Sequence, residues 1–159
     1  MKILQLWFGK KIPKQNLECI NQVKEFANSN NIIYQFIQKK EVKDFKLAMY
    51  ESDKLRFELA IKEPELLYLD CDVILNYIPK FEFKDKPYFH NFNGQLVSGV
   101  FYNNNCFSFF EKLFKDSVNR NIQPQNGWST KIIRNKSVYE FDPKSFNHKM
   151  FSYQRIMSK

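Results

Sequence analysis

The chain has 159 residues, enough for one domain with a single core but short for an enzyme. Hydrophobic residues make up 43% of it and aromatic residues 17%, a composition that excludes a disordered protein. The formal net charge of +8 suits anionic partners, but the lysines are scattered, so solvated lysine faces are favoured over a dedicated binding patch. Three widely spaced cysteines and the lack of a long apolar run favour a reducing, cytoplasmic setting.

Strand and helix patterns alternate in the first half of the chain. Residues 3–8 predict a strand, and residues 15–28 carry an apolar stripe at helical spacing. Residues 32–37 are rich in β-branched side chains and predict a second strand. Ser52 predicts the N-cap of the next helix, and the apolar run at residues 66–70 is typical of a buried strand.

The second half continues with shorter patterns. Residues 88–92 and 96–102 predict two strands. The three asparagines at 103–105 open a helix whose apolar side is phenylalanine-rich. A short helix is expected near residues 128–133, and a last strand at residues 138–141.

The order β-α-β-α-β at the start of the chain predicts an α/β sheet with short crossover connections. No linker or repeat divides the chain, so residues 1–159 are expected to form one compact domain. Ligands of such sheets bind at the carboxyl ends of the strands. Asp70 and Asp72 lie at that end of the third predicted strand, which makes them the first candidates for a functional site.

The segment Tyr68-Leu69-Asp70-Cys71-Asp72-Val73 carries two carboxylates separated by one residue. Burying an unpaired carboxylate costs on the order of several kcal/mol, so two of them at a strand exit call for a compensating cation. In an extended strand the side chains at i and i+2 share one face, where both carboxylates could bind one metal ion. Cys71 would then point to the opposite face and pack in the core.

A second pattern, Ser52-Asp53-Lys54-Leu55-Arg56, lies upstream and places an acid and a base at i and i+3 on one helical face. Taken alone, this pattern favours a helix cap and a surface ion pair worth roughly a few tenths of a kcal/mol. Together, the two segments resemble the S-D-x-x-R … Y-L-D-x-D region of the DXD-containing sugar-binding glycosyltransferases. That family includes capsule and lipopolysaccharide sugar transferases and the glucosylating toxins.

The resemblance extends to other segments of the chain. Residues 3–9 with Ile12-Pro13 are similar to the opening strand of the family, and residues 97–103 are similar to a later strand. Gly127-Trp128 and residues 141–143 match its closing segment more loosely. Many relatives carry His where this chain has Gln5 in the first strand.

The resemblance implies a GT-A-like fold, a mixed α/β sheet flanked by helices. It also implies a hexosyltransferase that moves a sugar from a nucleotide-diphosphate-sugar donor to a hydroxyl acceptor, with retention of configuration, in surface polysaccharide synthesis. Mn²⁺ or Mg²⁺ would be bound by Asp70 and Asp72, with His148 as the candidate third ligand. Catalysis would depend on both aspartates and Arg56. The expected donor-binding residues are Trp7, Asp53, Arg56, Tyr68, Ser98 and Gly99.

Several alternatives stay open at the level of single residues. Trp7 fits stacking on the donor base or ordinary core packing. A solvated or structural role is the alternative for His148, and His90 fits either a strand interior or the lining of an acceptor cleft. If the transfer inverts configuration, Asp142 and Glu140 are the candidate bases.

Alternatives stay open for the whole chain as well. Its shortness also fits an inactive nucleotide-sugar-binding remnant or a regulatory subunit. The positive charge fits a nucleic-acid binder, but no nucleic-acid-binding motif occurs, so we expect no nucleic-acid partner. The acceptor could be a glycan, a lipid-linked glycan or a protein. The charge permits peripheral contact with the inner face of a membrane, and an oligomer would complete the cleft of a small transferase.

Overall fold

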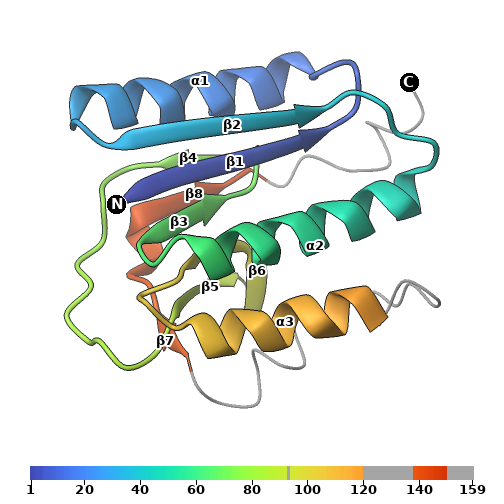
Figure 1. The fold of residues 1–159 in the computed structure, drawn as a ribbon. Helices are drawn as coiled ribbons and strands as arrows, with labels where there is room; N and C mark the ends of the chain where they lie inside the picture. Colours follow the sequence, from blue (N-terminus) through green and yellow to red (C-terminus); the bar gives the residue numbers. More distant parts are fainter. Residues whose placement is uncertain (93, 120–137, 150–159) are drawn as a thin grey trace.

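The computed structural model describes residues 1–92, 94–119 and 138–149 of the chain. Strands and helices alternate in its first half, and short strands predominate in its second half (Figure 1). The elements in chain order are β1 (Lys2–Phe8), α1 (Lys14–Ser29), β2 (Ile33–Lys39), α2 (Phe45–Lys62), β3 (Leu66–Leu69), β4 (Val73–Leu75), β5 (Tyr88–Phe92), β6 (Gln95–Tyr102), α3 (Phe107–Asn119), β7 (Tyr139–Glu140), a 3₁₀ helix (Pro143–Ser145) and β8 (Phe146–His148).

The main sheet has six strands in the order β2-β1-β3-β6-β5-β7. β2, β1 and β3 run parallel, while β6 is antiparallel to both β3 and β5. β4 and β8 form a separate antiparallel pair. The expectation of a mixed α/β sheet flanked by helices is therefore confirmed.

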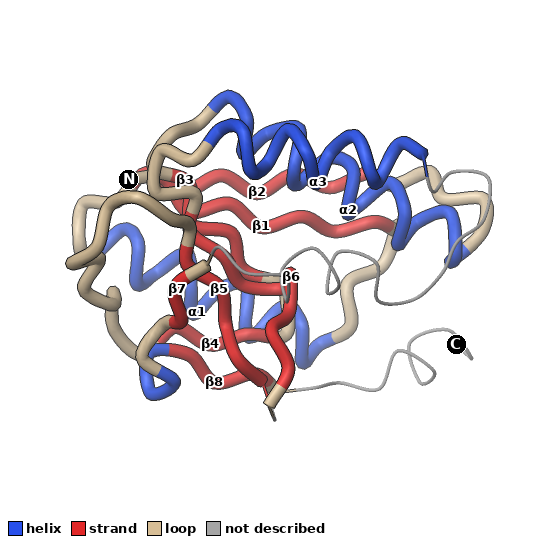
Figure 2. The backbone as a smooth tube through the Cα atoms, turned by 90° about the horizontal axis from the view of Figure 1, so that it is seen from below, coloured by secondary structure: helices blue, strands red, loops and turns tan. Residues whose placement is uncertain are grey.

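β3 separates two apolar cores because its alternate side chains face opposite ways. Leu67 and Leu69 pack with the buried side of α1, while Leu66 and Tyr68 pack with α2 and α3. All four residues are at most 1% exposed, as expected for a central strand covered on both faces. Figure 2 shows α2 and α3 together on one face of the sheet and α1 on the other.

The structure confirms most of the expected elements and corrects three of them. α2 begins at Phe45, so Ser52 lies inside the helix rather than at its N-cap. β3 ends at Leu69, and the expected strand at residues 138–141 is shortened to β7. The segment before Ser52 contains good helix formers such as Leu47, Ala48 and Met49, which extend the helix by two turns.

Two short strands, β4 and β8, were not expected from the sequence. The helix expected near residues 128–133 lies outside the described residues, as does Gly127-Trp128. None of the helices in the described part of the chain is long and apolar enough to cross a membrane.

Candidate metal centre

The Asp70-Cys71-Asp72 segment forms a tight turn between β3 and β4. The amide of Val73 donates to the carbonyl of Asp70 at 3.3 Å, which closes the turn. The two carboxylates thus converge through a turn and not through an extended strand, which corrects the geometric reason given for the D-x-D pattern. They nevertheless lie at the carboxyl end of β3, where ligands of α/β sheets bind.

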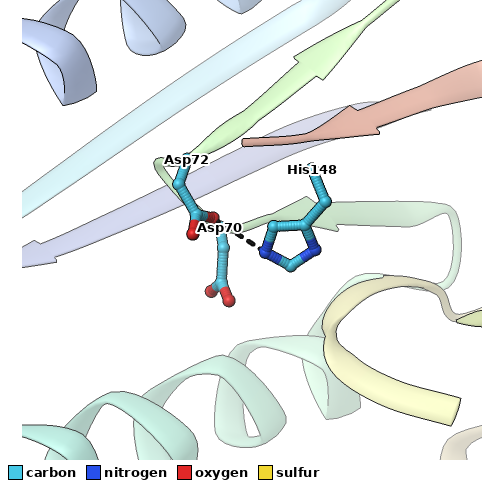
Figure 3. Close-up of side chains that lie close together, drawn as sticks. All are labelled: Asp70, Asp72 and His148. Atoms are coloured by element: carbon cyan, nitrogen blue, oxygen red, sulfur yellow. Dashed lines mark ion pairs between the residues drawn. The ribbon is translucent and has the colours of Figure 1, made fainter. Parts of the chain in front are cut away.

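Asp70, Asp72 and His148 form one cluster of groups able to bind a metal (Figure 3). One ligand atom from each residue lies within 4.8 Å of the others. His148 comes from β8, where it is paired with Val73 of β4. Because that pairing sets β8 beside the turn, an imidazole far along the chain reaches the two carboxylates.

The contact between Asp72 and His148 is an ion pair whose geometry would also suit two ligands of one metal. Oδ1 of Asp72 lies 3.1 Å from Nε2 of His148, and it is buried without a hydrogen-bond donor. Two atoms that bind one ion at right angles, each about 2.1 Å from it, lie about 3.0 Å apart. The unsatisfied buried oxygen and the mixed oxygen and nitrogen donors therefore fit a divalent metal.

The pKa of His148 is raised because the imidazole lies beside the two aspartates. Burial lowers the pKa of the imidazole, but the adjacent Asp72 and the charge of Asp70 raise it more, so the net shift is upward. The rings of Phe92 and His90 flank His148, with centroids 5.1 and 6.3 Å away. These rings restrict the orientation of the imidazole.

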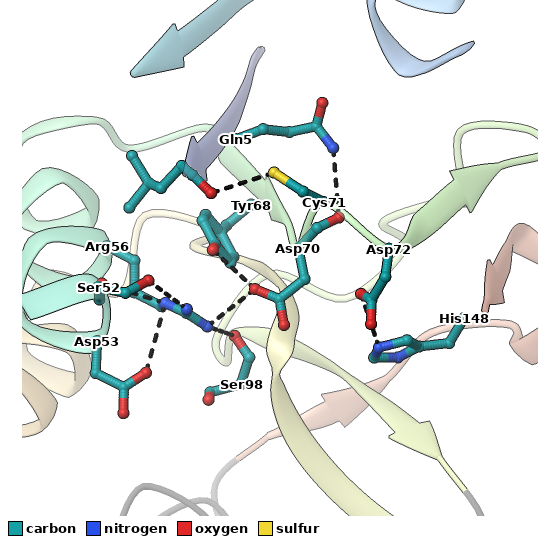
Figure 4. Close-up of polar contacts among 11 residues, drawn as sticks. Gln5, Ser52, Asp53, Arg56, Tyr68, Asp70, Cys71, Asp72, Ser98 and His148 are labelled. Atoms are coloured by element: carbon teal, nitrogen blue, oxygen red, sulfur yellow. Dashed lines mark hydrogen bonds and ion pairs between the residues drawn. The ribbon is translucent and has the colours of Figure 1, made fainter. Parts of the chain in front are cut away.

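Asp70 is held from the opposite side by two residues of the S-D-x-x-R and Y-L-D-x-D segments (Figure 4). Nη1 of Arg56 lies 3.3 Å from Oδ1 of Asp70, and the hydroxyl of Tyr68 donates to the same oxygen at 2.8 Å. Burial raises the pKa of Asp70, while the Arg56 guanidinium opposes the shift. The guanidinium also lies 4.4 Å above the centre of the Tyr68 ring.

Arg56 connects α2 to the cluster and is only 7% exposed. It donates to the hydroxyl of Ser52 at 2.8 Å and to the carbonyl of Ser98 at 3.1 Å, and Asp53 lies 3.6 Å from its Nε. A surface ion pair would leave the guanidinium in water, whereas here it is buried and reaches Asp70. The two sequence segments therefore belong to one polar network.

Gly99 of β6 allows the sheet to approach the cluster closely. Its carbonyl accepts the amide of Asp70 at 2.7 Å. A Cβ at this position would clash with Oδ2 of Asp70 and would lie 3.1 Å from its Cγ and 3.6 Å from Cε1 of His148. The missing side chain therefore makes room for the Asp70 carboxylate.

Each carbonyl of the turn is bonded from a different element. The side-chain amide of Gln5 on β1 donates to the Asp70 carbonyl at 3.3 Å, and that of Asn16 on α1 donates to the Cys71 carbonyl at 3.2 Å. The backbone amide of Lys149, directly after β8, donates to the Asp72 carbonyl at 2.8 Å. These three bonds fix the backbone that carries the two carboxylates. We call them the turn clamp.

Sequence reasoning missed the contributions of Gln5 and Asn16. Gln5 is fully buried, and its oxygen accepts from the hydroxyl of Tyr34 at 2.9 Å. Asn16 is 3% exposed and lies in helical register with the buried Cys19, Ile20 and Val23. A polar amide in an apolar stripe was the available signal, because such a group must find a buried partner.

Two further expected residues, Trp7 and Ser98, have described hydrogen bonds to groups outside the cluster. Trp7 is half-buried near the end of β1, and its indole donates to the Lys11 carbonyl at 3.1 Å. Ser98 reaches the cluster through its carbonyl, which Arg56 binds. Cys71 packs in the core as expected, where its thiol donates to the Leu6 carbonyl at 3.1 Å.

The other candidate acids and the second histidine have separate roles. Asp142 accepts the Tyr77 hydroxyl at 2.6 Å and caps the 3₁₀ helix, while Glu140 accepts from Asn91 at 3.4 Å. His90 is buried in β5, where burial and the nearby His148 lower its pKa to about 4. The Nδ1 atom of His90 has no hydrogen-bond partner.

The comparisons with known proteins give no family by sequence. No protein-family model matches the chain, and no curated protein matches it. Among solved structures, a glycosyltransferase involved in the glycosylation of the major capsid of PBCV-1 superposes with a TM-score of 0.66 at 15% identity, over 99% of both chains.

A second similar structure is a mutant of Drosophila beta-1,4-galactosyltransferase 7 in complex with manganese, UDP-Gal and xylobiose. It superposes with a TM-score of 0.52 at 10% identity, over 98% of this chain and 74% of the other. At these identities the likeness establishes the fold alone. The chain thus has a GT-A-like fold, with the Asp70, Asp72 and His148 cluster at the carboxyl end of β3.

Proposed function

We propose that the protein is a metal-dependent glycosyltransferase that moves a sugar from a nucleotide-diphosphate-sugar donor to a hydroxyl acceptor. The observation that carries the proposal is the cluster of Asp70, Asp72 and His148 in a GT-A-like fold. The buried Arg56 beside the cluster supplies a fixed positive charge. A donor diphosphate needs both kinds of positive charge, because negative charge grows on it as the sugar leaves.

Asp70, Asp72 and His148 are the residues that would hold the metal. A divalent ion bound there would act as a Lewis acid on the departing nucleoside diphosphate. Two carboxylates suit both Mn²⁺ and Mg²⁺, but an imidazole ligand favours the transition metal. We therefore propose Mn²⁺ as the preferred cofactor.

The other expected residues have distinct proposed roles. Arg56 binds a donor phosphate or hydroxyl, and Asp53, which is partly exposed beside it, binds donor hydroxyls. Tyr68 is 1% exposed, so we propose that it acts by orienting Asp70 and not by touching the donor. Trp7 and the backbone at Ser98 and Gly99 line the remaining donor site.

Retention of the anomeric configuration is the proposed stereochemistry. An inverting transfer requires a carboxylate free to take the acceptor proton. The two carboxylates of the cluster are metal-ligand candidates, and Asp53 pairs with Arg56. Asp142 and Glu140 bond elsewhere. A hexosyl donor and a surface polysaccharide product complete the proposal.

The test combines Mn²⁺ titration with a panel of nucleotide sugars. We expect the wild-type protein to bind Mn²⁺ and a nucleoside diphosphate together and to transfer or hydrolyse one sugar of the panel. Asp72→Asn should lower the rate at least about 100-fold, the size of effect typical when a charge-stabilising group is removed. Asp142→Asn, a carboxylate change at the N-cap of the 3₁₀ helix that precedes β8, serves as the matched control and should still bind Mn²⁺.

Two outcomes would contradict the proposal in different ways. If Mn²⁺ and nucleotides bind but no sugar of any donor is transferred or hydrolysed, the chain is an inactive binding remnant. If neither Mn²⁺ nor nucleotides bind, the cluster is not a metal site.

A further inference from the structure

The fold gathers lysines that are scattered in the sequence along one edge of the sheet. Lys10, Lys11 and Lys14 follow β1, and Lys39, Lys40 and Lys43 end or follow β2. All six are exposed, and we call them the basic rim. β1 and β2 are parallel, so both groups lie at the carboxyl edge (Figure 1). The edge that carries the basic rim is also the edge of the metal centre.

The register of the strands places the basic rim outside the metal centre. Leu4 pairs with Tyr68, which sets Asp70 level with Leu6, two residues before the end of β1. At about 3.3 Å per residue, the basic rim therefore lies about 7 Å or more beyond the level of Asp70. The lysines thus form the outer margin of this edge and not the wall of the metal centre.

The charge of the basic rim is not neutralised by neighbouring acids. Glu41 and Asp44 occur in the same segments, which leaves an excess of four positive charges. No ion pair joins a basic-rim lysine to a carboxylate in the described parts of the chain. At the opposite edge, the amino group of Met1 pairs with Glu65 and Lys2 pairs with Glu63. The basic rim therefore carries lysines without described ion pairs, whereas the cations of Met1 and Lys2 at the opposite edge are paired with acids.

Exposed apolar side chains accompany the basic rim. α1 and α2 both begin at this edge. Leu17, in the first turn of α1, is 43% exposed, and Leu47 and Met49, early in α2, are 40% and 43% exposed. Lysines interspersed with exposed leucine and methionine are typical of surfaces that bind anionic lipid, where charge attracts and apolar groups insert. A nucleic-acid surface would instead present exposed aromatic side chains for stacking, whereas Trp7 at this edge is half-buried with its indole bonded to the Lys11 carbonyl.

We propose that the basic rim, with Leu17, Leu47 and Met49, docks the protein on an anionic lipid bilayer. The metal centre then lies behind the membrane-facing edge of the sheet, at the carboxyl end of β3. The lysines would contribute electrostatic attraction to the bilayer, and the apolar side chains would contribute insertion into it. The two contributions to membrane affinity can therefore be measured separately. Neither requires sugar transfer, and the inference can be tested whether or not the protein is a transferase.

The test measures partitioning of the full chain onto vesicles by flotation. Wild type should bind phosphatidylglycerol-containing vesicles at low salt, bind neutral phosphatidylcholine vesicles little, and be released by high salt. The variant Lys10→Gln/Lys11→Gln/Lys39→Gln/Lys40→Gln should lower the partition constant on the order of 1,000-fold. The matched control Lys24→Gln/Lys80→Gln/Lys84→Gln/Lys112→Gln removes the same charge from exposed positions outside the basic rim and should change it less than about threefold.

A second variant separates the apolar contribution. Leu47→Ser/Met49→Ser should weaken partitioning several-fold while its salt dependence stays like that of wild type, since charge is untouched. Circular dichroism establishes that each variant is folded. Equal losses in the basic-rim variant and its matched control would overturn the proposal, as would failure of wild type to bind anionic vesicles. Tighter binding to single-stranded RNA than to vesicles at equal phosphate concentration would assign the surface to nucleic acid instead.

Discussion

Asp70 and Asp72 are separated by one residue, yet their carboxylates have different partners. Oδ1 of Asp70 is occupied by Arg56 and Tyr68, and its Oδ2 faces Gly99. In the described parts of the chain, the imidazole of His148 is the one charged group paired with Oδ1 of Asp72. Asp72 is therefore the carboxylate most available to an ion, while Asp70 links that ion to the guanidinium of α2.

Gly99 offers a test at the scale of one atom. Gly99→Ala should displace the Asp70 carboxylate, because the new Cβ would clash with its Oδ2. We expect Mn²⁺ affinity, measured by calorimetry, to fall at least about 10-fold, a size typical of disturbed ligand orientation. Gly94→Asn is the control, since a Cβ there meets nothing within 4 Å and Asn tolerates the positive φ of 81°. Unchanged affinity in Gly99→Ala would show that Asp70 is not held against the glycine.

Site residues that belong to a recognisable local sequence pattern could be predicted from the sequence. Asp70 and Asp72 follow an apolar strand, and Arg56 follows Asp53 at helical spacing. The other residues of the site could not be predicted, because only the folded structure brings them to the turn. Gln5 reads as one polar residue in a strand, and only the fold shows that its amide is 0% exposed and bonded to the Asp70 carbonyl.

The turn clamp belongs to the scale of elements, because β1, α1 and the segment after β8 each provide one of its bonds. Apart from the bond between the Val73 amide and the Asp70 carbonyl, the turn has no ladder of its own, so its carbonyls depend on donors from other elements. Each donor also fixes the position of its own element against the turn. The clamp thereby couples packing of α1 to the orientation of the carboxylates.

Asn16→Ala tests this coupling. The change leaves the Cys71 carbonyl buried without its donor, and we expect it to lower the free energy of unfolding by about 1–2 kcal/mol. Mn²⁺ affinity should also fall about 10-fold, because the turn loses one of its three supports. Asn21→Ala, at an exposed position on the same helix, should change neither quantity. Loss of stability without loss of affinity would restrict Asn16 to a structural role.

β4 and β8 show why some elements escape sequence-based prediction. Each has three residues, too few for a period-two pattern to be distinguished from chance. Their pairing joins residues 73–75 to residues 146–148, a long-range contact that no local propensity reports. The same pairing places His148 beside the two aspartates. The prediction of His148 as third ligand therefore could not draw on a predicted strand.

At the scale of the whole molecule, the predicted fold class was correct because the first half of the chain is locally consistent. Apolar strands and amphipathic helices alternate there at the expected lengths, and β1, α1, β2 and β3 follow that order. The start of α2 was wrong because its apolar residues do not form a single stripe. α2 packs against both the sheet and α3, which distributes its buried side chains around the helix.

A metal bound at the cluster would connect the small β4–β8 sheet to the main sheet. We expect Mn²⁺ to slow hydrogen exchange in β4 and β8, measured by mass spectrometry, by at least about 10-fold, since binding to the native state suppresses local opening. His148→Asn should abolish this protection, because it removes the only cluster residue that β8 contributes. Asn147→Ala, at an exposed position on the same strand, is the control and should retain it. Protection of β4 without β8 would contradict ligation by His148.

The position of His148 also sets the order in which the centre can form during synthesis. The carboxylates of Asp70 and Asp72 leave the ribosome well before His148, which lies 76 positions after Asp72. At about 5–20 residues per second, this gap corresponds to roughly 4–15 s of translation. During that interval the nascent chain presents the two acids without the imidazole of His148. Full metal affinity would therefore arise only after β8 has emerged and paired, so that a chain stopped before His148 could not retain the ion.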